Sequence, residues 1–241
     1  MDSAGPTGEE PGYLGARLAG LALTIACWFW ASNARLGGAG TIVLVWLTPL
    51  LAFPVAGLGR RRLDADPTPR RLRWITLLVH YGMVIALGCS MFAALGALFQ
   101  RPTLEVPVLG EAVRVLVLLT GFATFLTVLN LAVRGLGAPF VVKLSERLAT
   151  GFMYARTRNP MVLCSLSWFL CLGIQHQSGW FVLYLAVSIA PGLLYYVRVY
   201  EERELGLRFG RAYAEYRART PFFWPRLRVA PTGTPAEGAR R

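Results

Sequence analysis

The chain has 241 residues, of which 55% are hydrophobic and 16% are charged, and its mean hydropathy is +0.47. Because soluble domains average about a quarter charged residues, this composition excludes an ordinary soluble protein and indicates a membrane protein. The formal net charge of +12 comes almost wholly from arginine.

Apolar runs that approach the roughly 20 residues needed to cross a bilayer as helices follow one another along the chain. They cover residues 14–31, 41–58, 75–99, 113–133, 161–174 and 179–197. The fifth run is short and needs its flanks or a tilt to cross. We therefore predict an all-α fold, a polytopic bundle of six membrane-spanning helices, with five spans as the alternative.

The charges of the connecting segments alternate along the chain. Basic connections stay in the cytoplasm, so we expect a multi-pass protein of a bacterial inner membrane with both termini cytoplasmic. The basic face is expected to lie against anionic lipid headgroups. The bilayer is thus a predicted partner, and nucleic acid is not. The basic segments hold Arg60, Arg61, Arg62, Arg70, Arg71 and Arg73, then Arg134, Lys143, Arg147, Arg156 and Arg158, then Arg198, Arg203, Arg208, Arg211, Arg217, Arg219, Arg226 and Arg228.

Four parts follow from these patterns. Residues 1–12 and 229–241 are rich in small residues and proline without periodicity, and they are predicted to be disordered tails. Residues 13–133 hold the first four spans, and residues 134–228 form a core of an interfacial segment, a two-span hairpin and a C-terminal helix. Prolines inside the second and sixth spans predict kinks at Pro49, Pro54 and Pro191.

Two segments of the core are predicted to lie at the membrane surface. Residues 135–158 mix charged and apolar residues, which suits an interfacial or partly re-entrant helix. Residues 200–219 are predicted to form an amphipathic helix that lies on the membrane, ended by Pro221 and followed by the aromatic run Phe222-Phe223-Trp224. Its common face carries Glu202, Leu205, Phe209, Tyr213 and Tyr216.

Polar clusters bracket the last two spans. Arg158-Asn159-Pro160-Met161 precedes the fifth span and Glu201-Glu202 follows the sixth. A hairpin of spans brings both clusters back to the same water–lipid boundary. We therefore predict a site that faces one side of the membrane.

Together with the residues around them, these clusters resemble the isoprenylcysteine carboxyl methyltransferase and phospholipid methyltransferase superfamily. These are integral-membrane enzymes that use S-adenosylmethionine. The chain departs from the family at two places, with Gly151-Phe152-Met153-Tyr154 in place of Gly-Pro-Tyr and Val162-Leu163-Cys164 in place of Tyr-x-Gly. The resemblance covers about the last 90 residues, through Gly151, Tyr154, Arg158-Asn159-Pro160-Met161, Leu163, Glu201-Glu202, Leu205, Phe209-Gly210, Tyr213, Tyr216, Pro221 and Pro225.

Methyl transfer from a sulfonium is an in-line displacement, which needs alignment of the two substrates more than acid–base groups. An arginine and a glutamate pair match the anionic and cationic ends of the cofactor. The resemblance implies Arg158 and Glu201 as catalytic residues. The cofactor-binding residues that it implies are Tyr154, Arg158, Asn159, Pro160, Met161, Glu201, Glu202 and Tyr213.

Several alternatives stay open. The acceptor is small or lipidic: an isoprenoid carboxyl group, a phospholipid amine or a thiol. The rival functions are an NADPH-dependent sterol or steroid reductase and a non-catalytic protein that binds a lipid or partner.

No metal site is predicted, because the two histidines and the scattered cysteines do not have the spacing of metal ligands. His80, inside the third span without an acidic partner there, is interpreted as structural.

Overall fold

The computed structural model describes residues 11–35, 37–100, 102–104, 110–134 and 148–226, and these residues form helices and connections without a strand. The predicted tails fall almost wholly outside the described residues. The elements are α1 (Pro11–Asn33), α2 (Gly38–Thr41), η1 (Ile42–Leu47), η2 (Thr48–Leu51), α3 (Ala52–Ala65), α4 (Pro69–Leu98), α5 (Gly110–Arg134), η5 (Phe152–Ala155), α6 (Pro160–Gln175), α7 (Gly179–Tyr184), η6 (Leu185–Ile189), α8 (Ala190–Tyr196), η7 (Val197–Glu201) and α9 (Glu202–Arg219).

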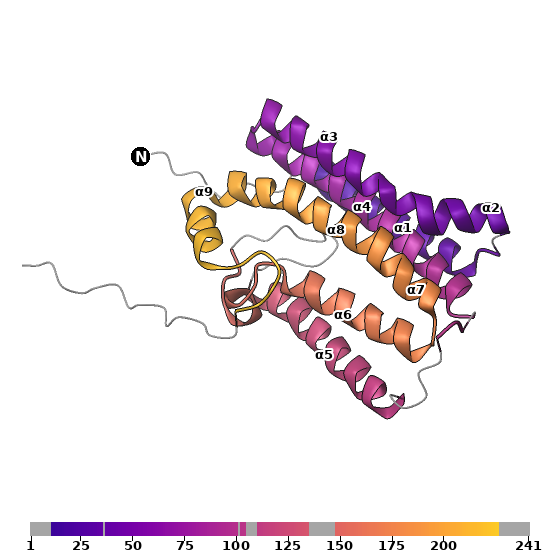
Figure 1. The fold of residues 1–241 in the computed structure, drawn as a ribbon. Helices are drawn as coiled ribbons and strands as arrows, with labels where there is room; N and C mark the ends of the chain where they lie inside the picture. The colour runs from indigo at the N-terminus through magenta and orange to yellow at the C-terminus, as the bar shows by residue number, and fades with distance from the viewer. Residues whose placement is uncertain (1–10, 36, 101, 105–109, 135–147, 227–241) are drawn as a thin grey trace, which may run out of the picture.

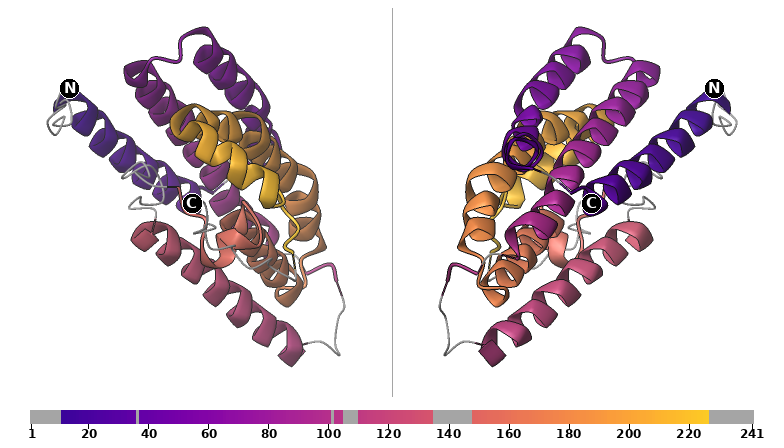
Figure 2. Two further views of the ribbon diagram at one scale, coloured as in Figure 1. Left: turned by 90° about the vertical axis from the view of Figure 1, so that its left-hand side faces the viewer. Right: turned by 90° about the vertical axis from the view of Figure 1, so that its right-hand side faces the viewer.

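Five helices of the described chain are long and apolar enough to cross a membrane, and α6, with 16 residues, is a shorter apolar helix. The predicted all-α membrane bundle is therefore confirmed. Helix α1 packs against α4, and α5 packs against α6. Figure 1 shows these pairs on either side of the long helix that runs from α7 to α9, and Figure 2 shows α1 and α5 on the same side of the molecule.

The second and last spans change to π-helical turns just before a proline, at Ile42–Leu47 before Pro49 and at Leu185–Ile189 before Pro191. Proline has no N–H, so Pro49 leaves the carbonyl of Val45 without its helical donor. The Ser90 hydroxyl of α4 donates to that carbonyl at 2.9 Å and also lies 2.7 Å from the Tyr184 hydroxyl. A side chain from a neighbouring helix thus satisfies the backbone group that proline frees inside the membrane.

The C-terminal helix does not begin at residue 200 as a separate element. It continues the last span through η7, so that residues 179–219 form one helical path. The path bends at Gly210, whose φ of 51° and ψ of −123° lie in a region open to glycine. Figure 1 shows this bend in α9. The predicted common face turns inward, because Glu202, Tyr213 and Tyr216 are buried.

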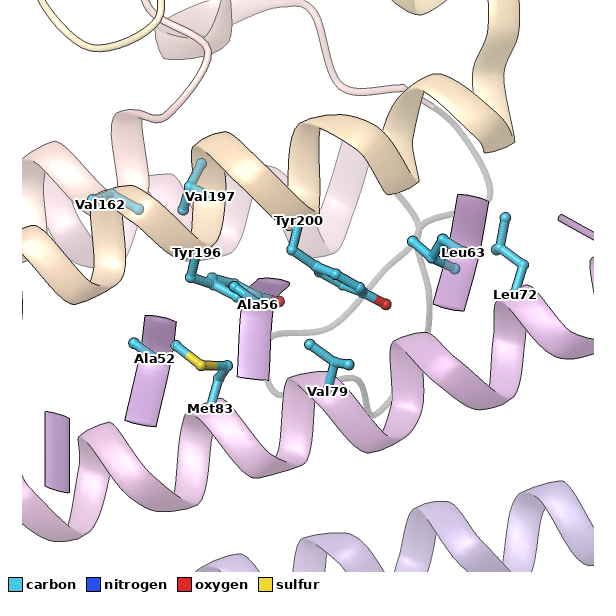
Figure 3. Close-up of a cluster of buried hydrophobic side chains, with 10 residues drawn as sticks. All are labelled: Ala52, Ala56, Leu63, Leu72, Val79, Met83, Val162, Tyr196, Val197 and Tyr200. Atoms are coloured by element: carbon cyan, nitrogen blue, oxygen red, sulfur yellow. The ribbon is translucent and has the colours of Figure 1, made fainter. Parts of the chain in front are cut away.

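A cluster of buried side chains joins α3, α4 and the last helix, and Figure 3 shows Tyr196 and Tyr200 within it. The two tyrosine rings stack with centroids 5.7 Å apart. Gly59 of α3 allows this packing. A Cβ at that position would lie 2.7 Å from Val79 Cγ2 and 2.8 Å from the Tyr200 ring.

Described arginines at the end of α3 and in α9 lie at one end of the bundle. Arg203 of α9 pairs with Asp64 at the end of α3 at 2.6 Å, and Arg60 lies 3.6 Å from the same carboxylate. At the other end, the backbone N–H of Thr103 donates to the carbonyl of Gln177 at 2.8 Å. The interfacial helix predicted over residues 135–158 lies mostly outside the described residues, and its described part holds a short 3-10 turn instead.

Candidate functional site

The chain after α9 folds back onto the segment that precedes α6. The backbone N–H of Arg158 donates to the carbonyl of Pro221 at 2.9 Å. Thr157 Oγ1 donates to the carbonyl of Phe223, and Asn159 Nδ2 donates to that of Phe222, each at 2.8 Å. These bonds hold the residues before α6 against the C-terminal segment. Pro160 then occupies the first turn of α6, where its missing N–H costs nothing.

Arg158 and Glu202 form a buried ion pair. Arg158 Nη2 lies 2.9 Å from Glu202 Oε1, and the two side chains are only 7% and 6% exposed. Two half-exposed arginines approach the other carboxylate oxygen, Arg198 at 3.4 Å and Arg217 at 3.8 Å. The hairpin therefore brings the two predicted polar clusters together, and it places Glu202 among three cations.

The pair leaves part of the guanidinium without a partner. Arg158 Nε and Nη1 are buried and have no hydrogen-bond partner in the described part of the chain. Buried donors of this kind are costly and therefore rare in proteins. An anionic group of a ligand would satisfy them.

The carboxylates that follow the last span differ from one another. Glu204 is buried and pairs with Arg208 at 2.8 Å. Glu201 lines a cavity together with Glu202 and Glu204, but no ion pair to Glu201 occurs among the described residues. Glu204 and Arg208 were missed in the sequence, although their spacing of three and seven residues from Glu201 places them on one helix face.

Tyrosines enclose this polar region. Tyr216 donates its hydroxyl to the carbonyl of Tyr154 at 2.8 Å, and Tyr213 is buried beside Tyr216 with ring centroids 6.3 Å apart. Burial, followed by the charge of Glu201 and by Cys164, raises the pKa of Tyr154 above its usual value. Tyr154 is therefore a neutral phenol near neutral pH and is able to donate a hydrogen bond.

One cavity of about 760 Å³ joins these groups to an apolar hollow. A volume of this order suits a small-molecule ligand. The polar end holds most of the predicted site residues, Tyr154, Arg158, Asn159, Met161, Glu201, Glu202 and Tyr213, whereas Pro160 is fully buried in the packing. The apolar end lies between the α1–α4 and α5–α6 pairs and is lined by residues such as Trp28, Phe92, Trp168 and Leu172.

The cavity also contains polar residues of α4 that the sequence did not point to. His80 Nδ1 lies 3.1 Å from the hydroxyl of Tyr196, and both residues line the cavity. Sequence reasoning took His80 as structural because its own span holds no partner. The partner lies 116 residues further along the chain, and no local spacing could reveal it.

The fold and site define an integral-membrane protein with a polar cavity at the end of the hairpin where α6 begins and the last span continues into α9. Residues 109–212 match the family model described as phospholipid methyltransferase. This confirms the resemblance drawn from the sequence, and the matched region holds Arg158 and all three carboxylates of the cavity. No curated protein and no solved structure matches the chain significantly. Residues 109–212 are thus similar to the phospholipid methyltransferase family.

Proposed function

We propose that the protein transfers a methyl group from S-adenosylmethionine to a small or lipidic acceptor that enters the cavity from the bilayer. The observation that carries this proposal is the cavity itself. It combines an arginine with unsatisfied buried donors, a glutamate without an ion pair among the described residues, and a continuous apolar extension.

The residues at the polar end fit the charges of the cofactor. Arg158 offers Nε and Nη1 to its carboxylate, and Glu201 offers a negative charge to its cationic part. Tyr154 and Tyr213 close the polar end, and the start of α6 at Met161 lines it. We assign Glu202 the role of fixing Arg158 through their ion pair rather than that of binding the donor directly. Asn159 likewise acts through the carbonyl of Phe222, which its amide binds.

When bound, S-adenosylmethionine would supply an electrophilic methyl group on a sulfonium, whose sulfur would leave as a neutral thioether once an acceptor lone pair had taken the methyl group. The protein's own residues contribute orientation. Arg158 and Glu201 hold opposite ends of the donor, so the reacting groups meet in line. The tyrosines and the tryptophans Trp28 and Trp168 exclude water from the cavity.

The polar end of the cavity shares one side of the bundle with the arginine-rich connections, including the Arg203–Asp64 contact. Basic connections favour the cytoplasm. We place the site on the cytoplasmic side for this reason, with both termini on that side and the donor taken from the cytosol.

The rival function as an NADPH-dependent reductase fits the cavity less well. Phosphate groups require several cations, and among the described lining residues there are two arginines, Arg158 and Arg208, against three glutamates. Both arginines already pair with a glutamate. A non-catalytic protein that binds an anionic lipid would satisfy the guanidinium donors of Arg158 but would leave Glu201 without a cationic partner among the described residues.

Binding of S-adenosylmethionine and of NADPH to the detergent-purified full chain tests the proposal. We expect saturable binding of S-adenosylmethionine that is lost in Glu201→Gln and in Arg158→Ala. Glu215→Gln and Arg211→Ala are matched controls, because these two exposed residues pair with each other. Binding of NADPH alone would favour a reductase, and binding of neither would favour a non-catalytic protein.

A further inference from the structure

A second polar group lies deeper in the cavity than the glutamates. His80 of α4 is within 3.1 Å of the Tyr196 hydroxyl, and Tyr196 stacks on Tyr200. Tyr200 in turn donates its hydroxyl to Thr76 Oγ1 at 3.2 Å. All four side chains line the cavity. Figure 3 shows the two tyrosine rings side by side above α4.

The position of this group separates the two halves of the cavity. Tyr196 precedes Glu201 by five residues in a continuous helix, so it lies roughly 7 Å further towards the middle of the span at a rise of about 1.5 Å per residue. Beyond it the lining is apolar, with Leu172 and Phe92. An acceptor whose apolar part occupies the hollow places its polar end beside His80 and Tyr196.

The charges of the cavity restrict that polar end. The two guanidinium groups among the described lining residues, Arg158 and Arg208, already pair with Glu202 and Glu204. Beside Tyr196 lie the uncharged side chains of Tyr200 and Thr76. A carboxylate placed beside His80 and Tyr196 would therefore be buried without a cation, which is costly, whereas an uncharged group would not.

We propose that His80 and Tyr196 hydrogen-bond the reacting end of the acceptor and that this end is an uncharged protic group, a thiol, a hydroxyl or a neutral amine, and not a carboxylate. The inference rests on the proposed function and deepens it by assigning the acceptor half of the cavity. His80 and Thr76 belong to α4, outside residues 109–212 that match the family. The acceptor half is therefore built in part by a helix that the family match does not cover.

Binding of simple amphiphiles tests this assignment. The full chain in nanodiscs, saturated with the unreactive donor analogue sinefungin, is titrated at neutral pH with dodecan-1-ol, dodecane-1-thiol or dodecanoate. Tryptophan fluorescence reports binding, because Trp28 and Trp168 line the cavity, and empty nanodiscs correct for partitioning. We expect the alcohol and the thiol to bind at least about tenfold more tightly than dodecanoate, because dodecanoate must bury its charge without a cation.

The variants His80→Leu and Tyr196→Phe are each expected to weaken alcohol and thiol binding by about tenfold while the affinity for S-adenosylmethionine stays at the wild-type value. His80→Gln, which keeps a hydrogen-bonding group, restores part of the binding. Tyr195→Phe is the matched control, since Tyr195 packs on Phe53 with ring centroids 4.9 Å apart.

Three results would overturn the assignment: dodecanoate binding as tightly as the alcohol, unchanged probe binding in both variants, or a parallel loss of donor affinity. Failure of the proposed function gives a different result. In that case the wild-type chain binds no S-adenosylmethionine, whether or not the probes bind.

Discussion

The buried ion pair between Arg158 and Glu202 predicts that the loss of one partner destabilises the protein more than the loss of the other. Removing one partner of a buried pair leaves the other charge uncompensated, at a cost on the order of 3 kcal/mol or more. Glu202 is the acid that pairs with Arg158 in the described chain, whereas Glu202 keeps Arg198 and Arg217 nearby when Arg158 is lost. Arg158 also carries two unsatisfied donors, and their penalty disappears with the side chain.

We therefore expect Glu202→Gln to destabilise the protein more than Arg158→Met does. A loss on the order of 3 kcal/mol lowers Tm by roughly 6–12 °C for a chain of this length, and Arg158→Met is expected to lower Tm by less than half as much. The double variant Arg158→Met/Glu202→Leu should recover most of the loss, because it leaves no buried charge of the pair.

Thermal unfolding in detergent, followed by circular dichroism without ligand, measures these shifts. Arg211→Met and Glu215→Gln serve as controls on an exposed pair of the same helix, for which the change is expected to be small. The reasoning is refuted if Arg158→Met is as damaging as Glu202→Gln, or if the double variant loses the sum of the two single losses.

Three further predictions concern the framework of the site. Gly59→Ala should lower the free energy of unfolding by about 1–3 kcal/mol, because the added Cβ overpacks against Val79 of α4 and against Tyr200. Gly57→Ala, whose Cβ would meet only the Tyr195 hydroxyl at 3.9 Å, should be tolerated; equal shifts in Tm would contradict the packing. Ser90→Ala should lower the free energy of unfolding by about 1–3 kcal/mol, because it removes the hydroxyl that donates to the Val45 carbonyl. A Tm equal to that of the wild type would argue against this hydrogen bond. Asn159→Ala should release the segment at Phe222, so limited proteolysis should cut between residues 220 and 226 faster than in wild type, with an unchanged cleavage rate as the contrary outcome.

Hydropathy located the spans because membrane helices need long apolar runs, and the arginine pattern placed the basic connections at one end. The predicted two-span hairpin also implied that Arg158 lies close to Glu201 and Glu202, and Arg158 pairs with Glu202. The sequence could not show which of the two adjacent glutamates pairs with Arg158, since neighbouring residues on a helix point in different directions and the outcome depends on the π-turn Val197–Glu201 that precedes α9. His80 was interpreted as structural because its hydrogen-bond partner, Tyr196, comes from a distant part of the chain.

The C-terminal segment shows a different limit of sequence reasoning. Its aromatic run was expected to lie in the headgroup layer, and Trp224 is 76% exposed, whereas Phe222 and Phe223 are partly buried. The adjoining residues act mainly through their backbone, because the carbonyls of Phe222 and Phe223 accept hydrogen bonds from Asn159 and Thr157. Side-chain type carries no information about such carbonyl contacts, so a pattern of aromatic residues could not predict them.

The central claim is tested most directly by incubating membranes with S-adenosylmethionine that carries a tritiated methyl group. The measured quantity is the label in the organic extract of those membranes. Membranes that contain the wild-type chain are predicted to yield extractable label in proportion to the protein, and membranes with Glu201→Gln are predicted to yield only background. Glu215→Gln should label as wild type does. Equal labelling by wild type and Glu201→Gln, or background labelling by wild type, would contradict the account of this chain as a membrane methyltransferase whose donor is held at Arg158 and Glu201.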